Sequence, residues 1–274
     1  MNYRVFILPF SLLVLSGTSF ADSAAPKSTY DWTGVYVGGF VGGASGANTT
    51  SSTNGLLTDA DRFTTGYNGS GSSNYSTSSS FIGGGTIGYN WQIPKTPYLI
   101  GLEGEYGYLG QSGSSQTTAV GHDFGDSVSY NTQNKTTIGS NFGYGLVGGR
   151  LGYAMDRSLF YVKSGAVFTQ VSTTNSSTPD HTGDAIPFSS NSTNSGGTTT
   201  GYAIGGGIEY APSWYSNKNL TLKAEYLYFG IPTSSNSSGS GAYCGGTCPP
   251  TSQETYHNST GGISTAKIGV NYKF

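Results

Sequence analysis

The sequence predicts an all-β fold: an eight-stranded antiparallel up-and-down transmembrane β-barrel with four long extracellular loops. Three observations lead to this prediction. Segments of about eleven residues alternate between apolar and polar side chains, which is the period of a strand with two different faces. The connections between these segments are alternately long and short. Only 9% of the 274 residues are charged, against roughly 25% in ordinary soluble domains.

The closing segment, residues 264–274, shows the alternation most clearly. Its apolar face carries Ala266, Ile268, Val270, Tyr272 and Phe274, and its other face carries Thr265, Lys267, Gly269, Asn271 and Lys273. A segment of this length is also what a tilted strand needs in order to cross a bilayer. We therefore expect it to be the last strand of the barrel.

Seven further segments are predicted as strands. They are residues 32–43, 81–93, 98–110, 142–155, 159–171, about 202–210, and 219–229. Short turns separate three pairs of strands, whereas long polar segments separate the others, at about 47–79, 111–140, 172–199 and 231–262. All long segments therefore emerge on one side, which is typical of outer-membrane barrels with short periplasmic turns. From their polar composition we expect long, flexible loops.

The N-terminus predicts export. Arg4 is the only charge before an apolar run at residues 5–15, and Ser19 and Ala21 form a small-x-small cleavage site. This order is typical of a signal peptide, so we predict that residues 1–21 are removed after Ala21. Residues 22–31 are then a polar periplasmic segment, and residues 32–274 form the barrel.

Charged residues and glycines favour a membrane barrel over a soluble one. Nine charges fall within the predicted strands, all on the polar face: Glu103, Glu105, Arg150, Lys163, Glu209, Lys223, Glu225, Lys267 and Lys273. Many glycines share that face, where they suit a narrow lumen that already holds long side chains. Aromatic residues gather toward the ends of the apolar faces, as in the girdles at membrane interfaces. We therefore expect lipid outside the barrel and the nine charges inside.

The nine charges are the best candidate site. Glu103 and Arg150 are predicted at equal depth on neighbouring strands, and opposite charges attract strongly in a low-dielectric interior. We interpret the set as an ion-pair network that fills the lumen. Two alternatives are a charged constriction that selects ions, and catalysis by paired carboxylates.

Several motifs resemble a known family. They are Trp32-Thr-Gly-Val-Tyr-Val-Gly-Gly, Gly101-Leu-Glu-Gly-Glu-Tyr, Arg150-Leu-Gly-Tyr, Lys223-Ala-Glu-Tyr and the ending Ile268-Gly-Val-Asn-Tyr-Lys-Phe. In order and spacing they resemble the small outer-membrane β-barrel family of Gram-negative bacteria, a porin-family class that includes the barrel of outer-membrane protein A and the 25–31 kDa surface antigens. The resemblance covers the strands but not the loops. It implies a place in the cell outer membrane, among its lipids.

Two further expectations concern the C-terminal end. We expect the barrel-assembly machinery to recognise the C-terminal strand, with Phe274 and Tyr272 as the assembly signal. The peptidoglycan-binding domain that follows the barrel in outer-membrane protein A is not expected, because this sequence ends at the closing strand, and a periplasmic anchoring role is therefore in doubt.

The long segments contain two cysteines and three histidines. Cys244 and Cys248 are expected to form a disulfide, as cysteine pairs in exported proteins usually do. A metal site would need further ligands, and only His257 is near, so no metal is expected. His122, His181 and His257 lie in three different segments and are expected to be solvated. A histidine or tyrosine could hold a porphyrin iron, and some relatives of the family are said to bind hemin, but no cofactor is expected.

Other function classes find little support in the sequence. Residues 83–88 match G-x-G-x-x-G formally, but they lie inside a predicted strand with no helix after them, so a dinucleotide site is not expected. We find no G-x-S-x-G, H-E-x-x-H or P-loop motif. The net charge of −2 does not indicate a nucleic-acid partner.

We therefore expect an integral outer-membrane barrel without enzymatic activity. Its role would be structural or in surface interaction (envelope integrity, adhesion or surface antigen), with host or surface ligands bound through the loops. The alternatives are a small porin-like passive channel, hemin or other ligand binding through the loops, and an outer-membrane enzyme such as the lipid-modifying barrels. The loops suit several surface roles, and their composition does not choose among them.

Overall fold

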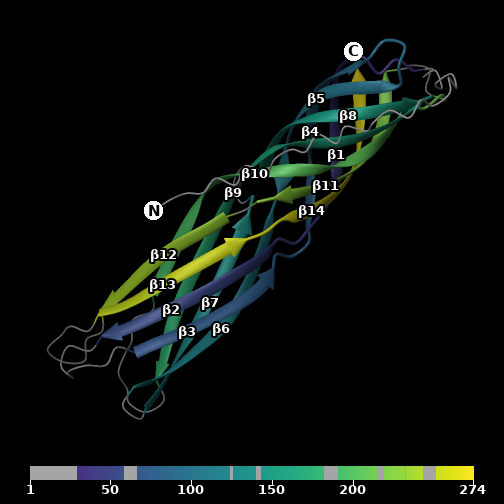
Figure 1. The fold of residues 1–274 in the computed structure, drawn as a ribbon. Helices are drawn as coiled ribbons and strands as arrows, with labels where there is room; N and C mark the ends of the chain where they lie inside the picture. Colours follow the sequence, from purple (N-terminus) through teal and green to yellow (C-terminus); the bar gives the residue numbers. More distant parts are fainter. Residues whose placement is uncertain are drawn as a thin grey trace, which may run out of the picture.

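The computed structural model describes residues 30–58, 67–123, 126–139, 143–181, 191–214, 219–231, 233–242 and 251–274. They form fourteen β-strands, shown in Figure 1. The predicted signal peptide lies outside the described residues, as does most of the segment 22–31. Within the described part of the chain, no helix is both long and apolar enough to pass through a membrane.

Eight strands close into a ring. They are β1 (Gly34–Ser45), β4 (Ser80–Gln92), β5 (Tyr98–Leu109), β8 (Tyr144–Met155), β9 (Ser158–His181), β10 (Asn191–Tyr210), β11 (Leu220–Gly230) and β14 (Ile263–Lys273). Each pairs antiparallel with its neighbour in the order β9-β10-β11-β14-β1-β4-β5-β8, and the β8–β9 ladder closes the circle. The predicted eight-stranded antiparallel barrel is therefore confirmed. The predicted strand bounds are close to those observed, except that β9 and β10 are much longer.

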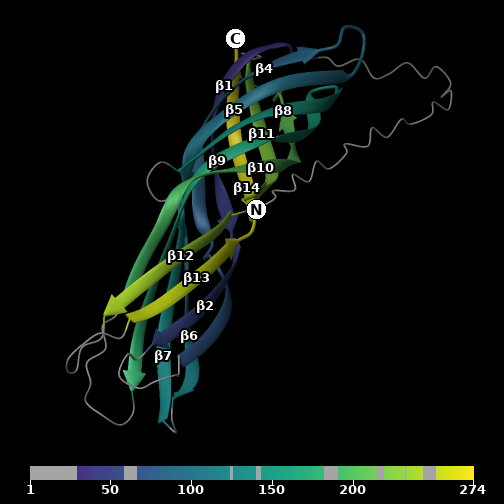
Figure 2. The ribbon, with the colours of Figure 1, turned by 60° about the vertical axis from the view of Figure 1, so that its left-hand side comes forward.

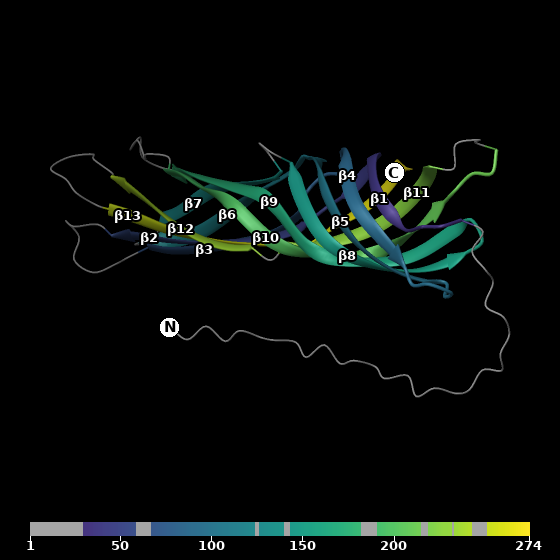
Figure 3. The same cartoon turned by 90° about the horizontal axis from the view of Figure 1, so that it is seen from above.

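The remaining strands form an extension of the ring. They are β2 (Asn48–Thr58), β3 (Tyr67–Ser76), β6 (Gln111–Asp123), β7 (Asp126–Ile138), β12 (Thr233–Ala242) and β13 (Thr251–Thr260). Together with the outer halves of β9 and β10 they prolong the ring along its axis, away from the tight turns and the C-terminus (Figures 1 and 2). Figure 3 shows the strands of both parts wrapping around one long axis.

The expectation of flexible loops was wrong for the described parts of these segments. The ladder between β1 and β14 reaches Ser45 and Ser264, and the ladder between β2 and β13 starts a few residues further on, at Thr49 and Thr260. The ring strands thus hold the chain extended and in register where each polar segment begins. Main-chain hydrogen bonds can then continue the sheet, and they need no apolar face.

The outward face of the ring is apolar. Its exposed side chains include Leu102 (69%), Val147 (64%) and Ile268 (64%) in the middle of the strands. Aromatic side chains lie at both ends of the strands: Phe81, Tyr106, Tyr108, Phe168, Tyr202, Tyr226 and Tyr228 toward the extension, and Trp91, Tyr98, Tyr153, Phe160, Tyr210, Tyr272 and Phe274 toward the turns.

The apolar band has the height of a membrane. Tyr98 and Tyr108 mark its two edges on β5, and the strand between them is about 34 Å long at about 3.4 Å per residue. With a tilt of about 40° this gives roughly 25 Å, which matches the outward apolar band of outer-membrane barrels. Aromatic neighbours join the strands at each edge, since the ring centroids of Tyr98 and Tyr153 are 5.8 Å apart and those of Tyr202 and Tyr228 are 6.3 Å apart.

Glycines on the inward face let the strands and their long side chains pack closely. A Cβ added to Gly165 would lie 2.2 Å from the carbonyl oxygen of Val147, and one at Gly88 would lie 2.3 Å from the Tyr36 hydroxyl. Several outward glycines have more room, since a Cβ at Gly43 would meet nothing within 4 Å. The inward glycines are therefore required by the contents of the ring.

Candidate functional site: the interior of the ring

Eight of the nine predicted charges lie buried inside the ring, each at most 4% exposed. They are Glu103, Glu105, Glu209, Glu225, Arg150, Lys163, Lys223 and Lys267. Four carboxylates face four cations, so the set is neutral as a whole. The ninth, Lys273, is only half-buried and lies at the turn end, where its ammonium donates to the carbonyl oxygen of Asp31.

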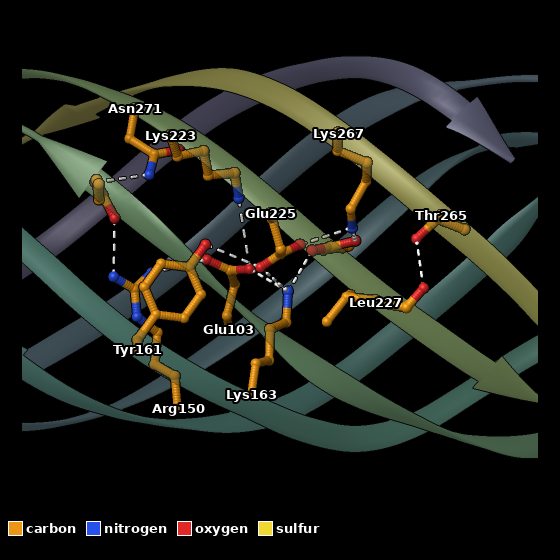
Figure 4. A network of polar contacts seen from close by, with 12 residues as sticks. Glu103, Arg150, Tyr161, Lys163, Lys223, Glu225, Leu227, Thr265, Lys267 and Asn271 are labelled. Atoms are coloured by element: carbon orange, nitrogen blue, oxygen red, sulfur yellow. Dashed lines mark hydrogen bonds and ion pairs between the residues drawn. The ribbon is translucent and has the colours of Figure 1, made fainter.

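Lys163 on β9 is the centre of the network (Figure 4). Its ammonium donates to the carboxylates of Glu103 and Glu105 and lies 3.5 Å from Glu225 Oε2. Lys267 Nζ lies 2.8 Å from Glu105 Oε2 and 2.8 Å from Glu225 Oε1. One oxygen from each of the three carboxylates lies within 4.8 Å of the others, a spacing that could hold a metal ion. The Lys163 ammonium supplies the positive charge that this arrangement needs.

Arg150 on β8 forms a second centre beside the first. Its Nη1 lies 3.2 Å from Glu103 Oε2, and its Nη2 lies 2.8 Å from Glu209 Oε2. The predicted equal depth of Glu103 and Arg150 was inexact, because Arg150 pairs in the ladder with Gly101, two residues earlier. The ion pair is therefore diagonal. Asn271 and Thr221 complete the coordination of Glu209 by donating to its Oε1.

Three inward tyrosines connect to the carboxylates, and sequence reasoning did not single them out. The hydroxyl of Tyr36 lies 2.5 Å from Glu103 Oε2, that of Tyr144 lies 2.9 Å from Glu105 Oε2, and that of Tyr161 lies 3.0 Å from Glu225 Oε2. The Arg150 guanidinium also lies over the Tyr161 ring, 4.3 Å from its centroid. The sequence could have indicated these tyrosines, because all three lie on the polar face of their strands. Phenol donors satisfy carboxylate lone pairs that ammonium groups leave free.

An apolar layer crosses the ring between the charges and the extension. All eight ring strands contribute to it: Phe40 and Ala44, Ile82, Leu109, Tyr144 and Leu146, Val167 and Val171, Ala203, Leu227 and Phe229, and Ile263. The layer contacts the network directly, since Lys267 Nζ lies 4.8 Å from the Phe40 ring centroid. The sequence analysis did not identify this layer, although apolar residues on the otherwise polar face, near the ends of several strands, indicated it.

A smaller apolar cluster closes the opposite end. The chain before β1 folds inward, and Tyr30 and Trp32 are buried with their ring centroids 4.7 Å apart. They pack with Leu99, Ala154, Leu159, Tyr161 and Ala211. Gln92 ties the segment to β4, because its side-chain oxygen accepts from Trp32 N at 3.2 Å. The charged layer is thus enclosed from both sides.

The inside of the extension differs, because its described residues are mostly polar, apart from buried Tyr256 on β13, and include no buried charge. Asn258 on β13 donates to Asn175 on β9, with Nδ2 and Oδ1 3.4 Å apart across the interior. Ser51 pairs with Asn258 in one ladder, and Asn134 pairs with Asn175 in another, so the four lie at one level. Buried Thr49, Thr136, Thr173 and Thr260 form the next level toward the ring.

The other predicted sites lie away from this interior. Cys244 and Cys248 are outside the described residues, so the disulfide remains a prediction. His257 on β13 is exposed and contacts Asn236 on β12. His122 is in β6 and His181 ends β9. Tyr272 and Phe274, the predicted assembly signal, point outward at the turn end, with their ring centroids 5.2 Å apart.

Comparisons with known proteins agree with this geometry. The sequence pattern of the family described as "Outer membrane protein beta-barrel domain" matches residues 10–274. The chain is similar to the 31 kDa outer-membrane immunogenic proteins of Brucella melitensis biotype 1 and Brucella suis biovar 1, each 29% identical over 255 residues, covering 93% of this chain and 88% of the relative.

Two solved structures of outer-membrane proteins align with most of the chain at low identity. The outer membrane protein OprG from Pseudomonas aeruginosa aligns over 92% of this chain and 99% of its own, with 10% identity and a TM-score of 0.34. The attachment invasion locus protein Ail of Yersinia pestis aligns over 81% of this chain and 98% of its own, with 10% identity and a TM-score of 0.29.

Proposed function

The chain belongs to the outer membrane protein β-barrel family, and on this premise we propose that it is a non-enzymatic barrel with a closed lumen and a role in envelope integrity or surface contacts. Its place is the outer membrane. The ring spans the lipid, and the extension stands outside the cell. The observation that carries the closed lumen is the neutral ion-pair network between an apolar layer on one side and the smaller apolar cluster of Tyr30 and Trp32 on the other.

The layers support closure for a physical reason. Moving an ion from water into an apolar layer costs far more than moving it into a hydrated pore. A charged constriction that selects ions would need free charges facing water, but each carboxylate of the network already contacts at least one cation. The network therefore fills the lumen rather than attracting ions into it. A small passive channel is the competing function.

The same contacts argue against catalysis by paired carboxylates. A general acid or base must reach the proton that it transfers. Glu103, Glu105 and Glu225 are buried, and lysines and phenols already occupy the positions around their oxygens. A substrate would have to displace these groups and pass an apolar layer.

The surface role is supported by the extension. Its described outward side chains are mostly Ser, Thr, Asn and Gln. The Brucella relatives are named as immunogenic proteins of the outer membrane, which fits a part of the chain that is accessible from outside. Tyr272 and Phe274 at the turn end are suited to a role as the signal for the barrel-assembly machinery.

Cysteine labelling on intact cells tests the orientation. In a background with both native cysteines changed to serine, Ser114→Cys on β6 should react with a membrane-impermeant maleimide. The control Lys95→Cys lies in the tight turn between β4 and β5 and should react only after the outer membrane is permeabilised. Labelling of the turn but not of the extension would overturn the proposal.

Solute uptake tests the closed lumen. Liposomes that contain the folded protein should swell no faster in an isotonic solution of a small neutral sugar than liposomes without protein. Swelling that increases with the amount of protein would favour the passive channel instead.

A further inference from the structure

The chain before β1 crosses the turn end of the ring. Residues 30–33 belong to none of the described ladders, because β1 begins at Gly34. Tyr30 and Trp32 in this segment are nevertheless buried. We call residues 30–33 the N-terminal latch. Since no ladder holds it, its position depends on side-chain contacts and a few single hydrogen bonds.

One attachment of the N-terminal latch is to β4. The backbone nitrogen of Trp32 donates to Gln92 Oε1 at 3.2 Å, and the backbone nitrogen of Gln92 donates to Thr33 Oγ1 at 3.2 Å. Because β4 is a ladder neighbour of β1, these two bonds join neighbouring strands. They can form in an open sheet and do not require the ring to be closed.

A second attachment comes from the last strand of the ring. The Lys273 ammonium donates to the carbonyl oxygen of Asp31 and lies 4.6 Å from the Tyr30 ring centroid. Beside it the backbone nitrogen of Phe274 donates to the carbonyl oxygen of Val35 at 2.9 Å. The N-terminal latch is therefore bonded to β4 and to β14, which are the two ladder neighbours of β1.

The rings of the N-terminal latch also contact the opposite wall. Tyr30 and Trp32 pack in one cluster with Leu159 and Tyr161 on β9. Around the ring, β9 is four strands from β1 in either direction. In an open sheet the side chains of one face point the same way, whereas closure turns the inward faces of opposite strands toward each other. These contacts therefore require a closed ring.

The ladder between β1 and β14 is the one that most needs support at the turn end. It joins the first and the last of the described strands, so no turn connects the two. Lys273 and Asp31 are 242 residues apart in the sequence, and closing a longer loop costs more conformational entropy. The ladder between β2 and β13 continues its other end. We therefore expect β1 and β14 to separate first at the turns.

We propose that the N-terminal latch docks only when β1 and β14 have paired, and that the docked latch then holds the turn end of this ladder closed. To separate β14 from β1 at the turns, Lys273 must leave Asp31 and Tyr30. Release of the latch then exposes the rings of Tyr30 and Trp32 to water, which is unfavourable. The proposal concerns the closure of the ring and does not depend on whether the lumen conducts.

A static plug is the competing interpretation. A plug would only fill the mouth of the ring, so its removal would loosen all the strands around it, including β5 with Leu99 and β8 with Ala154. Under our proposal the loosening is confined to β1 and β14. The ladder between β5 and β8 is a matched comparison, because it contacts the same cluster and also has no turn at this end.

Amide hydrogen exchange on the full mature protein in lipid nanodiscs tests the proposal. Lys273→Met removes the ammonium and keeps a long side chain. It should accelerate exchange at residues 36–39 of β1 and 270–273 of β14 at least tenfold, and Trp32→Ala should do the same without changing β14. Lys273→Arg keeps a cationic donor and should restore slow exchange. The control Lys95→Met lies in the exposed turn between β4 and β5 and should change nothing.

Tryptophan fluorescence gives a second readout. With Trp91→Phe and Trp214→Phe, Trp32 is the only tryptophan of the chain. Lys273→Met in this background should at least double the quenching of Trp32 by acrylamide, whereas Lys95→Met should leave it unchanged. The heat-modifiable gel shift shows that each variant is folded.

Three results would overturn the proposal. The first is unchanged exchange of β1 and β14 in folded Lys273→Met or Trp32→Ala, since the latch would then have no effect on the ladder. The second is equal acceleration in the ladder between β5 and β8, as expected for a static plug. The third is Trp32 that stays protected in Lys273→Met while the ladder opens, since docking would then not depend on β14.

Discussion

The ring and the extension are built from the same kind of strand but hold their interiors together differently. The ring is apolar outside and contains eight buried charges, with phenols and glycines fitted around them. The extension is polar outside, and its described interior holds mostly neutral hydroxyl and amide groups, with Tyr256 buried among them and no buried charge. The two share the strands β9 and β10, and the apolar layer separates them.

The difference reflects what lipid and water each require of a β-sheet. In lipid, the backbone must be fully paired, and the ring has a closed ladder with no edge. In water, edges are tolerated, and the extension has two places without a ladder. Buried charges in the ring favour one arrangement of its strands, because each charged side chain must meet an oppositely charged partner. Neutral polar groups in the extension are individually weaker, so stability there should be more evenly shared.

The sharpest test of this contrast removes the central cation of the ring. Lys163→Met leaves three carboxylates close together without the ammonium that contacts all of them. Breaking a buried ion pair by removing one partner costs about 3–5 kcal/mol. Unfolding in urea, followed by the heat-modifiable gel shift in lipid vesicles, should show a loss of this size.

Two controls accompany that variant. Lys135→Met on the exposed face of β7 should change stability by no more than about 0.5 kcal/mol. Adding Glu105→Gln to Lys163→Met should restore part of the loss, because it removes one of the repelling charges. If both lysine variants behaved alike, the contrast between ring and extension would fail.

A methyl group on the inward face tests how tightly the ring is filled. In Gly88→Ala the new Cβ would lie 2.3 Å from the Tyr36 hydroxyl oxygen and 2.7 Å from the Leu102 carbonyl oxygen. Overpacking of this kind costs about 1–3 kcal/mol. Gly85→Ala points outward, 3.7 Å from the nearest backbone oxygen, and should be close to neutral. Equal midpoints of urea unfolding for the two variants would show that the lumen has room.

A smaller effect is expected in the extension. Asn258→Ala removes the bond to Asn175 across its interior, and a neutral hydrogen bond contributes about 0.5–1.5 kcal/mol. Hydrogen exchange should become faster in β13 and in the outer part of β9. The urea midpoint of the ring should stay where it is. A shift of that midpoint would show that the two regions unfold as one unit.

The smallest effect concerns pH at the turn end. Burial raises the pKa of Tyr30 to about 12 from its ordinary value of 10. The neutral phenol is thus favoured in the folded state. Its contribution to the stability of the fold is complete below pH 10 and is lost as the pH rises from 10 to 12. Trp32 fluorescence should report release of the segment in this range.

Tyr30→Phe identifies the group responsible. Asp31, Glu209 and Arg157 also act on Tyr30, and the Lys273 ammonium lies 4.6 Å from its ring centroid. With phenylalanine the transition between pH 10 and 12 should disappear. A transition that persists would assign it to one of these neighbours.

The sequence was sufficient for the ring. Lipid outside and charge inside impose a strict alternation, and residues such as Ile268 and Lys267 show it directly. The extension could not be predicted in this way, because Ser, Thr and Asn occupy both faces of strands such as β2 and β12. No apolar period remains to mark them. Their pairing is set by the ring strands that they continue, so it depends on the whole fold and not on the local sequence.

The candidate site was predictable in its membership but not in its contacts. The alternation of side chains along each strand predicted that the nine charges point inward, and the structure buries eight of them inside the ring. The partners of each charge depend on the stagger of neighbouring strands, which alternation does not specify. Arg150 therefore meets Glu103 diagonally and reaches Glu209 on β10, two strands away. Lys273 lies on the same face as Lys267 but beyond the end of the network, where the chain before β1 folds in.

Single-channel recording in planar bilayers tests the central claim most directly. The folded protein, inserted into a phospholipid membrane with concentrated potassium chloride on both sides, should give no steady conductance steps if the lumen is closed, as we propose, by the charged network, the apolar layer and the apolar cluster at the turn end. Steady open steps from the unmodified protein would contradict the account.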